Sequence, residues 1–153
     1  MKFDALHQGI IEGCNCEREF SPIEDVESVF TRCVGTEAVS ARDFRSYLEA
    51  NTPLTRPLKF CKDHCGHRTV SINKYCDNAS AIKERYKNIQ FLSPEGLEIK
   101  GDAFVCIFKL QKGAGKVWDN SHGRAEQHRS LLKSDTFCDE SIMVSAVIAL
   151  KDF

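Results

Sequence analysis

The chain has 153 residues, a formal net charge of −1 and 42% hydrophobic residues. This length and composition suit one globular domain with its own core, so we expect a single domain over 1–153. No apolar run approaches the roughly 20 residues that span a bilayer, and the chain does not begin with a secretory signal. These features argue against membrane insertion and favour a cytoplasmic protein.

The charges are unevenly distributed along the chain, although their sum is close to zero. The first 50 residues carry five Lys/Arg and ten Asp/Glu, whereas the next 50 carry nine and five. One interpretation is that these two parts attract each other within the fold. The other is a basic face over 56–87 that could contact nucleic acid, although the balanced total argues against a strong phosphate-binding surface.

Capping signals predict helices in the first half of the chain. Ser21 and Glu24 have the spacing of a capping box. Apolar residues at helical intervals then predict a helix over 22–30. A second helix is expected over 40–50, ending before a Thr-Pro pair that disfavours helical backbone. A third, shorter helix is expected from about 78 or 80 to 87.

Strand signals dominate the second half. Residues 68–75 alternate between apolar and polar side chains, which is typical of a half-buried strand. Runs of β-branched and aromatic residues predict further strands over 89–92, 97–99, 103–110 and 142–150. The glycine-rich segment 112–116 lacks the spacing and ending of a phosphate-binding loop, so we interpret it as a hairpin turn. A helix is expected over 124–133.

Eight cysteines in a chain without an export signal indicate a reducing compartment. There they are more often metal ligands or small core residues than disulfides. Cys14 and Cys16 lie two apart in an extended segment and project to the same side. Cys61 and Cys65 have a spacing that lets one turn present two thiolates, and Gly66 would relax the backbone of such a knuckle.

These two pairs together make a closed tetrahedral set of four thiolates. A closed set is typical of structural Zn²⁺ rather than catalytic Zn²⁺. His64 or His67 could replace one thiolate, and unliganded thiols or a disulfide framework are the alternatives to a metal. The other four cysteines are interpreted as small core residues; they are Cys33, Cys76, Cys106 and Cys138.

The expected fold class is therefore α+β. A helix-containing, zinc-tied part over 1–88 would pack on a mainly antiparallel sheet over 89–153.

The densest polar run lies at 119–129 and contains two histidines, two carboxylates and two arginines. One interpretation is a metal-dependent nuclease or phosphoesterase, in which His122 is the general base and Asp119 or His128 binds the metal. Its arginines would then hold the phosphate. The alternatives are a solvated surface loop, or a contact surface with Trp118 as an aromatic anchor.

The sequence favours a small zinc-stabilised protein-interaction or accessory module without catalysis of its own. This interpretation rests on the closed ligand set, the balanced charge and the lack of a convincing catalytic motif. Its partner would be another protein. Whether the chain is an enzyme stays open at this point, with the polar run 119–129 as the alternative site.

Overall fold

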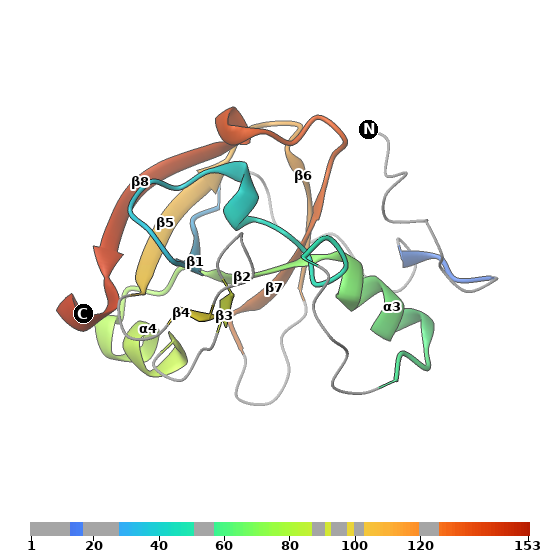
Figure 1. The fold of residues 1–153 in the computed structure, drawn as a ribbon, viewed down its shortest axis with the longest axis horizontal. Coiled ribbons are helices and arrows are strands. Elements are labelled where there is room, and N and C mark those ends of the chain that lie inside the picture. The colour runs from blue at the N-terminus through green and yellow to red at the C-terminus, as the bar shows by residue number, and fades with distance from the viewer. Residues whose placement is uncertain are drawn as a thin grey trace.

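The computed structural model describes residues 13–16, 28–50, 57–86, 91–92, 98–99, 103–119 and 126–153. In these ranges the chain forms a six-stranded antiparallel sheet, a separate two-stranded ladder and the helices α3 and α4 (Figure 1). The α+β class predicted from the sequence is confirmed. Among the described helices, none has the length and apolar character needed to cross a bilayer.

The strands of the large sheet run in the order β6-β7-β2-β1-β5-β8. Their bounds are Gly115–Asp119 for β6, His128–Lys133 for β7, Val70–Lys74 for β2, Phe30–Val34 for β1, Phe104–Leu110 for β5 and Ile142–Ala149 for β8. The small ladder pairs β3 (Phe91–Leu92) with β4 (Glu98–Ile99), and the helices are α3 (Cys61–Arg68) and α4 (Ala79–Tyr86).

Most of the predicted strands are confirmed, and so is the third helix. α4 begins after Asn78, whose side-chain oxygen accepts the N–H of Ala81 at 3.1 Å. This is the capping that favours Asn before a helix.

The sequence placed the sheet mainly over 89–153, but its two central strands, β1 and β2, come from the first half of the chain. Most of the helix predicted over 22–30 lies outside the described residues, and its last residue begins β1.

Two other helix predictions are wrong. Over 40–50 the chain forms a 3₁₀ turn at Ala41–Asp43 and further turns. Here Ser46 and Glu49 exchange side-chain-to-backbone hydrogen bonds of 3.0 and 3.2 Å in a capping-box arrangement, which starts a new turn at Ser46 and so interrupts a helix over 40–50. Over 124–133 the described residues form a short turn at 126–127 and then β7, which pairs with β2 on one side and β6 on the other. Its four consecutive buried residues (129–132) match a strand covered on both faces rather than a surface helix.

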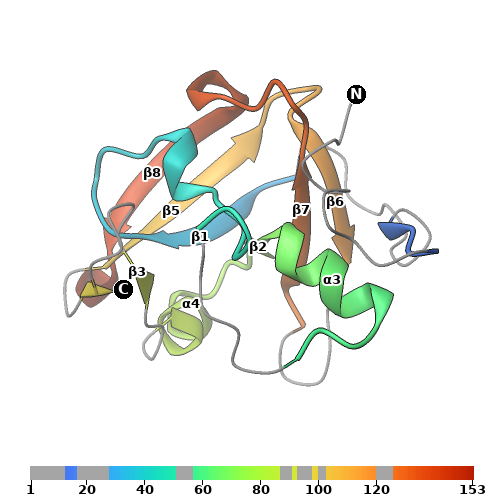
Figure 2. The same cartoon turned by 45° about the vertical axis from the view of Figure 1, so that its right-hand side comes forward.

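The sheet is strongly curled. β5 and β6 are joined by only residues 111–114, yet β7, β2 and β1 lie between them in the sheet. In a flat sheet the two strands would be about 19 Å apart, at about 4.8 Å per strand. The link itself is folded back, since Ala114 donates its N–H to the Gln111 oxygen at 3.0 Å. The predicted hairpin is therefore wrong: the segment is a turn, but β5 and β6 are not paired. Figure 2 shows β5 and β8 running at a steep angle to β6 and β7.

The curl gives the sheet an inner face with the main core and an outer face with two smaller clusters. The inner core joins residues of β1, β2, β5, β6 and β7 with Phe44, whose ring meets that of Phe108 edge-on at 5.0 Å. Because successive residues of a strand point to opposite faces, the residues adjacent to these core residues point to the outer face. There α4 packs on Val105, and the cysteine-bearing segments pack on Trp118 and Leu132.

Tyr86 links α4 to the centre of the sheet. Its hydroxyl is 2.9 Å from the Thr31 hydroxyl and accepts a 2.9 Å hydrogen bond from the Asn73 amide. Burial raises the pKa of Tyr86 above its ordinary value, although these hydrogen bonds act in the opposite direction. The neutral hydroxyl therefore joins β1, β2 and α4 beneath the outer face.

We expect Tyr86→Phe to lower the free energy of unfolding by about 1–3 kcal/mol, because it leaves the polar groups of Thr31 and Asn73 buried without their partner. Chemical denaturation monitored by circular dichroism measures the change. Tyr47→Phe is the matched control, since Tyr47 is 57% exposed, and it should change the stability by less than about 0.5 kcal/mol. Equal effects of the two substitutions would contradict the role given to the Tyr86 hydroxyl.

Candidate metal centre

Two segments far apart in the sequence carry the cysteine cluster. The first is Gly13–Cys16, in which Gly13 has a φ of 79° that favours glycine. The second is α3, which starts after Phe60 because the Asp63 carboxylate accepts the Phe60 N–H at 3.0 Å. The predicted knuckle at Gly66 is wrong, since this residue lies inside α3. One helical turn places Cys61 and Cys65 on the same face instead.

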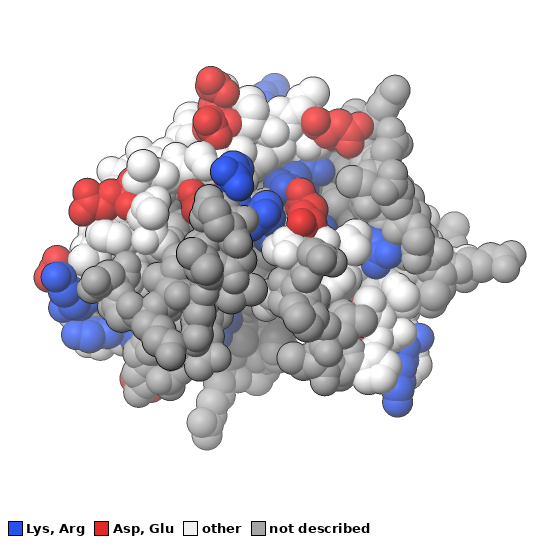
Figure 3. Space-filling view, in the orientation of Figure 1, with Lys and Arg blue, Asp and Glu red and all other residues white. Residues whose placement is uncertain are grey.

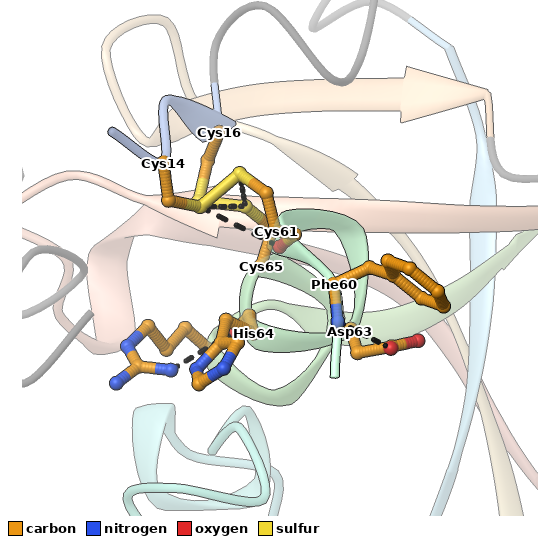
Figure 4. Close-up of a disulfide and its surroundings, with 8 residues drawn as sticks. Cys14, Cys16, Phe60, Cys61, Asp63, His64 and Cys65 are labelled. Carbon is orange, nitrogen blue, oxygen red and sulfur yellow. Dashed lines mark hydrogen bonds between the residues drawn. A yellow bond between two sulfur atoms is a disulfide. The ribbon is translucent and has the colours of Figure 1, made fainter. Parts of the chain in front are cut away.

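The four cysteine sulfurs form one cluster between these segments (Figure 4). Cys14 is bonded to Cys61 and Cys16 to Cys65, with Cα–Cα distances of 5.1 and 5.5 Å. The Cys65 sulfur also lies 3.8 Å from the sulfurs of both Cys14 and Cys61. The sulfurs of Cys14, Cys61 and Cys65 all lie within 4.8 Å of one another and could hold a metal ion.

The cluster is seated on the outer face of β6 and β7. Cys16, Cys65 and Trp118 are fully buried, and Leu132 is 3% exposed. Cys14 and Cys61 are partly buried at the outer side of the same cluster. Trp118 therefore lies beneath the cysteine cluster, and its interpretation as the aromatic anchor of a contact surface is wrong, because its side chain is fully buried.

The two histidines of α3 lie away from the sulfurs. Figure 4 shows the His64 ring pointing away from the cysteine sulfurs. The His67 ring lies 6.3 Å from the Tyr47 ring, and its pKa is lowered by burial and by the nearby Arg68 and His64. Among the described residues, neither histidine nitrogen belongs to the group of clustered ligand atoms. In the described part of the chain, the compact ligand set is therefore the sulfurs of Cys14, Cys61 and Cys65, without a histidine.

The other four cysteines have different surroundings. Cys106 is buried, whereas Cys33 and Cys76 are partly buried against the α4 cluster. Cys138 is exposed, so its prediction as a core residue is wrong. It precedes a 3₁₀ turn and donates its N–H to the Ser141 hydroxyl at 3.0 Å.

The polar run 119–129 is only partly described, and His122 lies outside the described residues. Asp119 and Arg129 are opposite each other on β6 and β7 and form an ion pair at 3.3 Å. His128 precedes Arg129 on β7, so its ring is on the other face, where Nε2 is 3.2 Å from the Ser71 hydroxyl. Asp119 and His128 therefore do not converge on one metal position.

The charged side chains are mixed on the face shown in Figure 3, where Lys and Arg form small groups among acidic and neutral residues. Within 57–86, Lys83 donates to the Phe153 oxygen at 3.0 Å and Arg85 to the Asn73 side chain at 3.3 Å. These two cations are engaged within the protein. A nucleic-acid contact through 56–87 stays a prediction.

Comparisons with protein-family models, with curated proteins and with solved structures find no match to this chain.

We expect Gly13→Ala to lower the free energy of unfolding by about 1–2 kcal/mol, because a side chain is strained at positive φ. Gly66→Ala is the matched control, since a Cβ at either position meets nothing within 4 Å and Gly66 has helical backbone. This control should raise the stability by about 0.5–1 kcal/mol. Denaturant unfolding of both variants measures the difference, and a stabilising Gly13→Ala would contradict the bend before Cys14.

Proposed function

We propose that the chain, with its thiols reduced, binds one structural Zn²⁺ through Cys14, Cys16, Cys61 and Cys65, and that it acts as a small interaction or accessory module. The observation that carries the proposal is the meeting of four sulfurs, two fully buried and two partly buried, from two segments about 50 residues apart.

The spacing of the sulfurs supports a tetrahedral site. A tetrahedron with Zn–S bonds of about 2.3 Å has edges of about 3.8 Å. The Cys65 sulfur lies 3.8 Å from those of Cys14 and Cys61. The Cys16 sulfur is bonded to Cys65 but is not in the 4.8 Å group of Cys14, Cys61 and Cys65, so after reduction of the two disulfides its side chain would rotate inward to complete the tetrahedron. Four soft thiolates are a ligand set that favours Zn²⁺ over the hard cations Mg²⁺ and Ca²⁺.

The position of the site supports a structural role. Four protein ligands leave no open position for water or substrate, which a catalytic zinc requires. Two of its ligands, Cys16 and Cys65, are fully buried, and so is Trp118, which lies beneath them. Because it joins Gly13–Cys16 to α3 across the outer face of β6 and β7, the ion would contribute to folding directly.

Exposed apolar side chains next to α3 support a protein partner. Phe60, directly before the helix, is 70% exposed, and Tyr47 is 57% exposed. Leu48 is 39% exposed and donates its N–H to the His67 oxygen at the other end of the helix, at 3.0 Å. Aromatic side chains are enriched in protein–protein interfaces. The zinc-tied helix would thus hold a surface suited to another protein.

The first test is the metal content of protein purified under a reductant that does not bind metal. We expect one zinc per chain by native mass spectrometry and elemental analysis. Removal by a chelator should lower Tm, since a loss of only about 3 kcal/mol corresponds to about 6–12 °C in a domain of this size.

Cys61→Ala should lose the zinc and reproduce the low Tm of the chelated protein. Cys138→Ala is the matched control, because Cys138 is exposed and outside the cluster; it should keep both the zinc and the Tm. A second, exchangeable metal ion that supports hydrolysis of nucleic acid or a phosphate ester would contradict the non-catalytic module and favour the enzyme alternative.

A further inference from the structure

The disulfides in the cysteine cluster connect the two segments rather than closing within either one. Cys14 is bonded to Cys61 and Cys16 to Cys65, so both bonds join Gly13–Cys16 to α3. Four cysteines allow two other pairings. One of them, Cys14–Cys65 with Cys16–Cys61, would also join the two segments, whereas the other would bond Cys14 to Cys16 and Cys61 to Cys65. This last pairing would leave the two segments unconnected. The observed pairing therefore preserves the same connection that a shared metal ion would make.

We propose that the zinc site is a peroxide-responsive centre in which oxidation exchanges the ion for the disulfides Cys14–Cys61 and Cys16–Cys65, so that zinc is released while the two segments stay joined. This inference rests on the zinc site proposed above. It assigns to that site a reaction with peroxide, whose products are free zinc and the two disulfides.

The exchange balances with hydrogen peroxide as the oxidant. Four zinc-bound thiolates, two peroxide molecules and four protons give two disulfides, four water molecules and free Zn²⁺. In each half, one thiolate attacks a peroxide oxygen and the O–O bond breaks, which gives a sulfenic acid and hydroxide. The partner thiolate then attacks the sulfur of the sulfenic acid, so that the S–S bond forms, the S–O bond breaks and a second hydroxide leaves. Each hydroxide takes up a proton to become water. The four electrons lost by sulfur reduce the two peroxide molecules.

The burial of the sulfurs gives the order of the two steps. Cys14 and Cys61 are partly exposed, whereas Cys16 and Cys65 are fully buried. Peroxide therefore meets the Cys14–Cys61 pair first. Once this pair is oxidised, zinc keeps only two thiolates and its affinity falls, so the ion leaves at the first step. Loss of the ion then gives peroxide access to the second pair.

Two of the remaining cysteines are poor competitors for peroxide. Burial raises the pKa of Cys33 to about 11 and that of Cys106 to about 12, so both stay protonated at neutral pH. The thiolate is the reactive form, and these thiols react slowly. Cys138 is exposed and could react at the surface, so the experiment uses a Cys138→Ala background.

The experiment treats reduced, zinc-loaded full-length protein with increasing hydrogen peroxide. Zinc release is followed with a chromogenic chelator, thiols are counted, and disulfides are mapped by mass spectrometry of unreduced peptides. We expect one zinc released per chain with the first equivalent of peroxide, and four thiols lost after two. The mapped bonds should be Cys14–Cys61 first and Cys16–Cys65 second. The oxidised protein should melt close to the zinc form and well above the reduced, chelated form.

The single variants Cys14→Ala and Cys16→Ala test the pairing separately, after reduction and oxidation without metal. The first should form the Cys16–Cys65 bond and the second the Cys14–Cys61 bond. A bond between Cys61 and Cys65 in either variant, or in the parent protein, would overturn the exchange.

The outcomes also separate this inference from the proposed function. Absence of zinc from the reduced chain would overturn both. If the reduced chain binds zinc, but peroxide releases it with other disulfide pairings, sulfinic acids or an unfolded chain, the exchange is overturned. The proposal of a structural zinc site then still holds. Zinc that stays bound after the Cys14–Cys61 disulfide has formed would overturn the predicted order and the release mechanism.

Discussion

The connection between Gly13–Cys16 and α3 is the constraint on which the site depends. The two segments meet through four sulfurs, and these sulfurs rest on Trp118 and Leu132 from neighbouring strands. α3 itself is short and polar, and only Cys65 within it is fully buried. Isolated helices of this length are marginal in water, so its position depends on what holds it to the sheet. The cysteine cluster supplies that attachment.

The curl of the sheet decides what lies beneath the cluster. It closes the inner face around one large core, in which Phe44 packs on Phe108. It leaves the outer face to be covered in two places, by α4 at one end and by the cysteine-bearing segments at the other. Because adjacent strand residues point to opposite faces, Leu131 packs in the inner core and Leu132 packs beneath the cysteine cluster on the outer face. The inner core and the cysteine cluster therefore share β6 and β7 as a common support.

Much of the secondary structure could be predicted from local pattern. Alternation and β-branched runs located β2, β5 and β8, and an Asn cap located α4. β7 was mistaken for a helix because its residues are apolar without alternation, and only pairing on both sides distinguishes such a strand from a buried helix. β6 was missed because a short segment with Lys116 and Trp118 carries little strand signal. The segment over 40–50 has a helical pattern, but local side-chain hydrogen bonds and the burial of Phe44 in the core hold it in turns.

The sequence by itself determined that Cys14, Cys16, Cys61 and Cys65 are the cysteines with metal-ligand spacing, because such spacing depends only on local backbone geometry. It also determined the α+β class, since helical and strand periodicities are local properties. Only the tertiary structure decided that α3, rather than a knuckle, presents the second pair. It likewise decided that Trp118 is buried beneath the sulfurs and that Asp119 and His128 face opposite sides of the sheet. These outcomes depend on strand pairing and register between residues distant in the chain, for which a single sequence carries no local signal.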